Sequence, residues 1–305
     1  MCKSIRQAHA ASDWKNRPYS DAQMRRCGDA HLERTRPKAL EATEQQQRPR
    51  SKVYVLGGFG GAAGLDIARH LFAEGSGLYA AHTEAEEEDN GGDHTDLAFC
   101  LDSHPGMSNH CTKEDCEAPL AAGLQRAAQH HRSLPTGTPP LITIVGCNTM
   151  HLALASVPVP KQHVELVRLP EAAAASLNEA IALDKPPPKI LLWSTMATVA
   201  GGLYHEAVRA HGLALEAPPQ EEMETVERII NLLKRGSTEV AMALAAPLLE
   251  QHAAEGSVVL LGCTELPLLV PAVHSVPELK SLRLVDCNQA VAKAALARVR
   301  IADGV

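Results

Sequence analysis

The chain has 305 residues, of which 45% are hydrophobic and 21% are charged. This balance is ordinary for a protein with a buried core and excludes predominant disorder, and the length suits one large α/β unit or two half-sized lobes. The formal net charge of −7 argues against a nucleic-acid partner, because phosphate binding needs a concentrated basic face. No run of about 18 apolar residues is present, so we expect no membrane span.

Residues 1–50 differ in charge from the rest of the chain. They hold 11 Lys/Arg and 6 Asp/Glu, whereas the remainder is distinctly acidic. We expect a disordered basic extension here, in preference to an organelle-targeting peptide. The eight cysteines occur without an apolar leader segment, which favours a reducing compartment, and we therefore expect a cytoplasmic protein.

The first elements after this extension are typical of an α/β fold. Residues 53–56 form a short β-type run, the glycine-rich turn 57–61 follows, and apolar residues then recur at helical spacing through residues 67–72. An acidic, glycine-containing segment at 82–94 predicts a solvated loop before a strand at 97–101.

Two strand ends carry the same short motif. An alanine-rich helix predicted at about 117–132 precedes the apolar run Leu141–Val145, typical of a strand buried on both faces, and Gly-Cys147 follows directly. The order recurs further along, with predicted elements at 189–193 (strand), 219–235 (helix), 238–254 (helix) and 258–261 (strand). Gly-Cys263 follows the last of these strands.

This alternation predicts an α/β fold with two pseudo-symmetric lobes, each a mostly parallel sheet flanked by helices. We expect the first lobe at 51–170 plus 280–305 and the second at 171–279. Ligands bind at the carboxyl ends of strands in such sheets. Cys147 and Cys263 both fall there, so we expect the active site at these strand ends.

Two facing thiols suit acid/base chemistry at a carbon acid. One thiolate removes the α-proton of a small carboxylic acid, and a thiol on the opposite face returns a proton. Backbone N–H groups at the start of the next helix, and donors from Asn148, Thr149 and Thr264, would stabilise a thiolate or substrate carboxylate. Either cysteine alone could equally be a small buried hydrophobe, but the matched contexts of Cys147 and Cys263 favour function.

The sequence resembles the aspartate/glutamate racemase superfamily, within its aspartate racemase-like branch, over residues 53–301. An ordered set of short motifs carries the resemblance. These are Val55–Gly60, Gly146–His151, Trp193–Thr198, Gly202–Tyr204, Pro219–Glu222, Lys234–Gly236, Gly262–Leu268 and Val285–Asp286.

The resemblance implies a homodimer whose chains each have two lobes with the active site between them, and it implies neither pyridoxal phosphate nor a metal. It assigns Cys147 and Cys263 as the bases for opposite faces of an amino acid or other small carboxylate, and Lys234 to the substrate carboxylate. The other residues that it places at the site are Gly58, whose backbone would approach the substrate, and Asn148, Thr149 and Thr264.

One loop departs from the family pattern. The family has an Arg that grips a carboxylate after the second strand, whereas His110 is the nearest replacement in residues 105–112. An imidazole is only partly charged near neutral pH, which puts dicarboxylate specificity in doubt.

Two further residues have alternative roles. His151 would orient the thiolate, bind substrate, or simply be a hydrogen-bonded helix histidine. Glu265 would either accept a hydrogen bond beside the site or cap the following turn.

Two other site types fit the sequence less well. His104, His110, Cys111 and Cys116 cluster in sequence, but their spacing matches no common zinc site, and we expect no metal. The 57–61 turn lacks the spacing and the acidic partner of a dinucleotide-binding loop.

Three functions therefore stand, in order of preference. The first is a cofactor-independent amino-acid racemase of the aspartate/glutamate type. The second is a lyase, decarboxylase or isomerase of the same superfamily, similar to dimethylsulfoniopropionate lyases or arylmalonate decarboxylase. The third is a binding protein that keeps the fold without catalysis.

Overall fold

The computed structural model describes residues 52–58, 61–75, 97–103, 113–182 and 188–304. Residues 48–305 form one compact unit. The expected extension at 1–50, the acidic loop at 82–94 and His110 lie outside the described residues.

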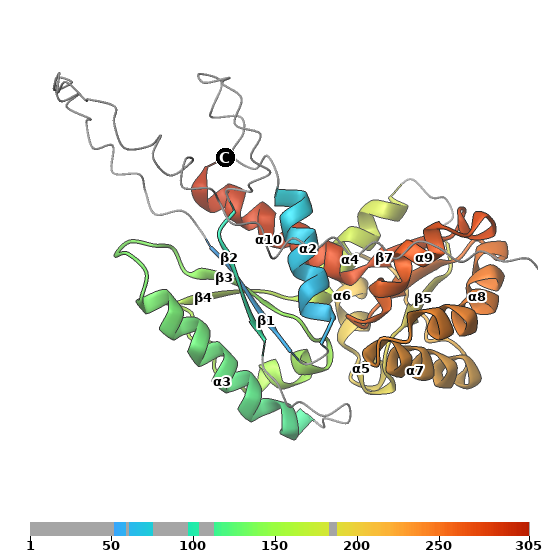
Figure 1. The fold of residues 1–305 in the computed structure, drawn as a ribbon, viewed down its shortest axis with the longest axis horizontal. Coiled ribbons are helices and arrows are strands. Elements are labelled where there is room, and N and C mark those ends of the chain that lie inside the picture. Colours follow the sequence, from blue (N-terminus) through green and yellow to red (C-terminus); the bar gives the residue numbers. More distant parts are fainter. Residues whose placement is uncertain (1–51, 59–60, 76–96, 104–112, 183–187, 305) are drawn as a thin grey trace, which may run out of the picture. The chain divides into compact units, whose positions relative to one another are not determined.

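The described strands form two parallel sheets, as Figure 1 shows. The first sheet has the order β2 (Phe99–Ser103), β1 (Val53–Gly57), β3 (Leu141–Val145) and β4 (Val164–Val167), and the second has the order β5 (Ile190–Trp193), β6 (Val258–Leu261) and β7 (Arg283–Asp286). Every pairing is parallel. The predicted α/β fold class is therefore confirmed.

The two sheets share one strand order. A parallel bridge joins Leu191 of β5 to Glu216, which lies between β5 and β6 in the chain. Glu216 therefore pairs with β5 in the way that β2 pairs with β1 in the first sheet. With this bridge included, β3 and β6 occupy equivalent positions in the two strand orders. Cys147 and Cys263 follow these two strands.

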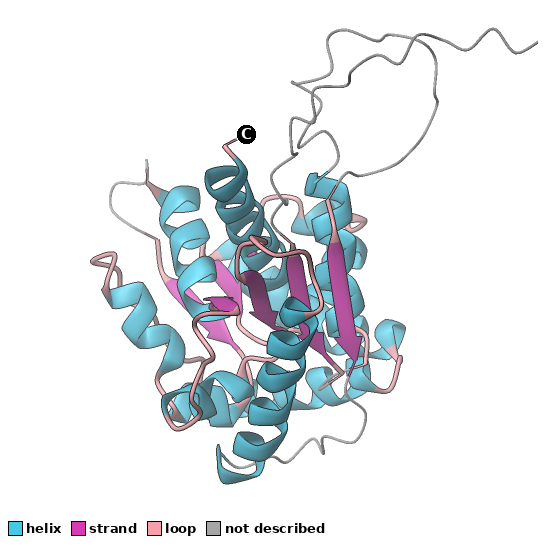
Figure 2. Cartoon of the chain, turned by 90° about the vertical axis from the view of Figure 1, so that its left-hand side faces the viewer, coloured by secondary structure: helices cyan, strands magenta, loops and turns pink. Residues whose placement is uncertain are grey.

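Helices cover both sides of the strands (Figure 2). The α-helices are α2 (Ala63–Gly75), α3 (Lys113–Arg132), α4 (Leu169–Ile181), α5 (Met196–Ala200), α6 (Leu203–Arg209), α7 (Gln220–Lys234), α8 (Thr238–Ala254), α9 (Val270–His274) and α10 (Cys287–Asp303), and the 3₁₀ helices are η3 (Thr149–Ala155), η4 (Leu266–Leu269) and η5 (Pro277–Leu279). In the described part of the chain, no helix has the length and apolarity that a membrane span requires.

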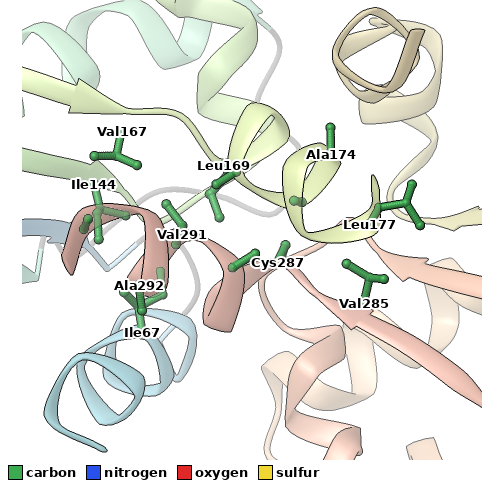
Figure 3. Packing of buried hydrophobic residues seen from close by; sticks show 14 of the residues in the cluster. Ile67, Ile144, Val167, Leu169, Ala174, Leu177, Val285, Cys287, Val291 and Ala292 are labelled. Atoms are coloured by element: carbon green, nitrogen blue, oxygen red, sulfur yellow. The ribbon is translucent and has the colours of Figure 1, made fainter. Parts of the chain in front are cut away.

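One apolar core is shared by both sheets. Alternate residues of β1, β3, β5 and β6 meet side chains from α2, α4, α6 and α10 in this cluster. Figure 3 shows Cys287, Val291 and Ala292 of α10 beside Ile67 of α2 and Leu169 of α4. The opposite face of the first sheet packs on α3, and that of the second packs on α7 and α8. The shared core joins the two sheets in one unit.

The division of the chain into two lobes stays a prediction, and one of its boundaries needs correction. Residues 280–305 were assigned to the first lobe, but β7 pairs with β6 in the second sheet. The chain returns to the first sheet only at α10, which packs on α2 and β3. The apolar run of β7 is too short for its partner to be chosen from sequence alone.

A methyl group at Gly262 should destabilise the fold. A Cβ there would lie 2.5 Å from Cδ1 of the buried Leu192 and 3.1 Å from Cε2 of Tyr204, so the core must shift. We expect Gly262→Ala to lower the free energy of unfolding by about 1–3 kcal/mol in urea titrations followed by circular dichroism. Gly61→Ala is the control, because a Cβ at Gly61 meets nothing within 4 Å. Equal stability of the two variants would contradict this packing.

Candidate active site

Both candidate cysteines follow a glycine that is bonded to the neighbouring strand. The Gly146 N–H donates to the Leu56 carbonyl at 2.8 Å, and the Gly262 N–H donates to the Trp193 carbonyl at 2.7 Å. A Cβ on Gly146 would lie 3.3 Å from the same Leu56 carbonyl oxygen. The chain therefore leaves β3 and β6 in the same way, and each thiol starts from an equivalent sheet edge.

Cys147 is partly buried and faces backbone donors. The N–H groups of Met150 and Thr149, at the start of η3, bond its sulfur and favour the thiolate. Burial and the nearby Glu265 carboxylate act more strongly in the opposite direction and raise the pKa of Cys147 to about 12. These two influences therefore favour the thiol form of Cys147 at neutral pH.

Cys263 is buried and donates its S–H to a carboxylate. Its Sγ lies 3.1 Å from Oε2 of Glu265, and the Thr264 hydroxyl donates to the same oxygen at 3.3 Å. Burial, followed by the Glu265 charge, raises the pKa of Cys263 well above its ordinary value. Glu265 begins η4 without capping it, so it is an acceptor beside the site.

Lys234 and Glu265 each act on both thiols. The Lys234 ammonium, at the end of α7, lowers the pKa of Cys147 and of Cys263, and the Glu265 carboxylate raises both. Charges shift pKa values strongly only over short distances. The two thiols, one cation and one anion therefore share one region, although β3 and β6 belong to different sheets.

Asn148 is held by groups from other elements. Its side chain is buried, its Oδ1 accepts a 2.7 Å hydrogen bond from the Tyr204 hydroxyl, and its Nδ2 lies 3.9 Å from Sγ of Cys287. Tyr204 and Cys287 begin α6 and α10 respectively, within the first turn of each helix. Asn148 was predicted to bind substrate, and these bonds fix it next to Cys147.

Both ring nitrogens of His151 are engaged by the backbone. Its Nε2 accepts the Leu169 N–H at 3.2 Å, so Nδ1 carries the proton and donates to the Cys147 carbonyl at 2.8 Å. Burial lowers the pKa of His151 to about 4. The neutral ring thus ties the Cys147 turn to the start of α4, and it has no free nitrogen for the predicted contact with substrate.

The remaining predicted residues are distributed unevenly. Thr149 lies two residues after Cys147, Thr264 directly follows Cys263, and Gly58 directly follows β1 with a φ of 88°, which favours glycine. His110 lies outside the described residues, as do His104 and Cys111 of the His/Cys cluster in the sequence. Cys116 is buried in α3, against the outer face of the first sheet.

Within the described residues, Asp66, His70 and Asp286 could hold a metal, since their ligand atoms lie within 4.8 Å of one another. The Asp66 carboxylate is already occupied, because one oxygen accepts from Arg69 and the other from Asn288. The Arg69 guanidinium also lies 3.2 Å from Nε2 of His70. Arg69 thus pairs with the Asp66 carboxylate, and Nε2 of His70 lies 3.4 Å from Oδ2 of Asp286. These groups fit a network of internal polar contacts better than a metal site.

Cys287 and Asn288 contact the residues that follow the two candidate cysteines, and the sequence analysis singles out neither of them. Both follow β7, which is a third strand ending in polar residues, and Asn288 donates to the Thr264 carbonyl at 2.9 Å. The signal that could have found them is their place at a strand end in a parallel sheet.

The chain is similar to known racemases in sequence and fold. A family model described as Asp/Glu/Hydantoin racemase matches residues 83–295. No curated protein matches the chain in sequence.

Three solved structures illustrate the likeness in fold. Picrophilus torridus aspartate racemase is 20% identical with a TM-score of 0.58, over 82% of this chain and 94% of that one. An aspartate racemase homologue from Pyrococcus horikoshii OT3 is 20% identical with a TM-score of 0.53, over 82% and 99%. Glutamate racemase from Campylobacter jejuni subsp. jejuni is 17% identical with a TM-score of 0.55, over 81% and 85%.

The buried His151 should make stability depend on pH. Its pKa of about 4 in the folded state lies below the ordinary 6.5, so the unfolded chain binds more protons between these values and stability falls as the pH drops. We expect this residue to account for about 2 kcal/mol of the loss in unfolding free energy between pH 7 and pH 5. In urea titrations, His151→Gln should lose that share of the pH dependence. His274→Gln is the control, because His274 is exposed, and this variant should keep the full pH dependence of the unfolding free energy.

Proposed function

Because the chain belongs to the Asp/Glu/Hydantoin racemase family, we propose that it is an amino-acid racemase that works without a cofactor. In this proposal Cys147 and Cys263 exchange protons with opposite faces of the substrate α-carbon. One observation carries it: two thiols leave equivalent strand ends and share the charges of Lys234 and Glu265. Core packing alone gives no reason for a matched pair of thiols beside a buried carboxylate.

The substrate itself would activate the first thiol. Burial and Glu265 disfavour the thiolate of both cysteines. An amino-acid zwitterion would bring an ammonium group next to Cys147 and displace water, and its positive charge would favour the thiolate. The backbone N–H groups of Thr149 and Met150 are already aimed at that sulfur.

Proton transfer then follows from the two environments. The Cys147 thiolate takes the α-proton, so that an S–H bond forms and the C–H electron pair remains on the α-carbon and its carboxylate. The Cys263 S–H, already oriented by Glu265, delivers its proton to the other face and becomes the thiolate. Lys234 would bind the substrate carboxylate, where negative charge develops. The product is the opposite enantiomer, and solvent resets the two sulfurs.

The alternative within the superfamily is a lyase, decarboxylase or isomerase. The sequence feature that favours it is the absence of an Arg from residues 105–112, which weakens the case for a dicarboxylic amino acid. Each of these reactions also passes through thiol chemistry at a small carboxylate. Product analysis separates them from inversion, because elimination and decarboxylation change the carbon skeleton or its saturation.

The first test follows hydrogen exchange and inversion together. Enantiopure amino acids, with aspartate and glutamate among them, are incubated in D₂O, and the products are analysed by NMR and chiral chromatography. We expect deuterium at the α-carbon together with inversion for at least one substrate. Cys147→Ser and Cys263→Ser should each lower the racemisation kcat by about 10²–10⁴-fold, which is typical for loss of a general acid or base.

Cys100→Ser is the matched control, because Cys100 is a partly buried thiol on β2, away from both Gly-Cys turns. It should retain the wild-type rate. Absence of exchange in the whole panel, or products with altered carbon skeletons, would reject the racemase proposal. Wild-type rates in both serine variants would reject the two-thiol mechanism.

A second test changes the two charges that the thiols share. Glu265→Gln removes the anion that raises both pKa values, so both thiols should ionise at lower pH. Lys234→Met removes the cation that lowers both and should act in the opposite direction. Iodoacetamide labelling, resolved by peptide mass spectrometry over pH 7–10, measures the thiolate fraction of each cysteine.

In the wild type, labelling of Cys147 should rise continuously across that range, since its pKa lies at about 12. A plateau below pH 9 would contradict the strongly desolvated environment. Shifts of the same sign in Glu265→Gln and Lys234→Met would contradict the proposed charge pair.

A further inference from the structure

The first two residues of α10 contact the two Gly-Cys turns, residues 146–148 after β3 and residues 262–264 after β6. Cys287 lies against the Asn148 amide, in the turn after β3, and Asn288 donates to the Thr264 carbonyl, in the turn after β6. The α10 start is itself fixed, because Oδ1 of Asp286 accepts the Asn288 and Gln289 N–H groups. One rigid helix end thus touches the residue that follows each candidate base.

Asn288 makes the more directional of these two contacts. Its side chain is fully buried, and its Nδ2 donates to Oδ2 of Asp66 and to the Thr264 carbonyl oxygen, each at 2.9 Å. Asp66 belongs to α2, which packs on the first sheet, whereas Thr264 follows β6 of the second. The amide therefore links the two halves next to Cys263.

We propose that Asn288 is a positioning residue, which fixes the Thr264 carbonyl to Asp66 and so holds the Cys263 thiol at the distance from Cys147 that transfer across one α-carbon requires. The proposal deepens the proposed function and rests on it. The bridge joins two acceptors, a carboxylate and a carbonyl, so it needs a group with two hydrogens. Among uncharged side chains of this length, only the Asn amide supplies both.

A loosened Thr264 turn would reduce inversion of the substrate more than exchange of its α-proton with solvent. Cys147 would still remove the α-proton from the enantiomer that faces it, exchange it with solvent and return deuterium to the same face. Inversion would fail, because it needs Cys263 in line on the other face. Misplacement by about 1 Å costs on the order of 10²-fold in rate. Exchange would then exceed racemisation, whereas simple loss of folded protein lowers both equally.

The experiment compares Asn288→Ala with Gln289→Ala. Gln289 is the matched control, because it lies on the same turn of α10 and its side-chain amide donates to Glu74 of α2 instead of to the Thr264 turn. For Asn288→Ala we expect the racemisation kcat to fall by about 10–100-fold at little-changed KM. The ratio of deuterium exchange to inversion should rise by about tenfold or more for one enantiomer only. Gln289→Ala should keep the wild-type ratio.

The ratio of deuterium exchange to inversion does not depend on the fraction of folded protein. If Asn288→Ala does not fold, Asn288→Ser, which keeps one hydrogen-bond donor, replaces it. Equal losses of exchange and inversion, or an unchanged ratio, would overturn the positioning role.

A readout independent of catalysis separates this proposal from the racemase assignment. Iodoacetamide labelling of Cys263 relative to Cys147 should rise about fivefold or more in Asn288→Ala, because the buried thiol gains access when its turn is freed. If the wild type exchanges no amino acid but the labelling ratio rises as expected, the racemase assignment fails, and only the link by which Asn288 fixes the Cys263 turn stands. An unchanged labelling ratio overturns the positioning role whatever the activity.

Discussion

The geometry of the site depends on two close approaches of backbone to backbone. At the end of each central strand, a glycine N–H bonds the neighbouring strand, from Gly146 to Leu56 and from Gly262 to Trp193. A Cβ at either glycine would press on the Leu56 carbonyl or on the Leu192 side chain. The glycines fix where the chain leaves the sheet, so the cysteine that follows each glycine lies at the carboxyl end of its strand. Two equivalent strands thus present two equivalent side chains.

The burial that shapes the site also disfavours the thiolate of both cysteines. Desolvation is the largest influence on the pKa of both cysteines, and the Glu265 carboxylate adds to it. A thiol that stays protonated is a poor nucleophile and a poor target for oxidation. Because a cationic group beside the sulfur favours the thiolate, a bound amino-acid zwitterion would raise the reactivity of the thiol at neutral pH in the proposed mechanism.

The sequence was most informative where local chemistry decides structure. Strands β3 and β6 have the predicted bounds, because an apolar run ended by Gly-Cys leaves little choice, and α7 and α8 follow their helical spacing closely. The partners of Asn148 and Thr264 could not be predicted, because Tyr204 and Asn288 are distant in sequence and reach them only through tertiary packing. The apolar run of β7 is also too short to predict which sheet the strand joins, and tertiary packing decides this.

Helix α10 explains how two sheets can share one site. Its apolar side lies in the core that both sheets build, while its first turn holds the polar contacts to Asn148 and Thr264. Apolar burial is not directional and permits small slides between packed elements. Hydrogen bonds from a buried amide to two fixed acceptors have strict geometry and restrict such slides. In this arrangement the core supplies most of the cohesion, and a few buried polar groups restrict the separation of the two cysteine turns, on which the proposed proton transfer across one α-carbon depends.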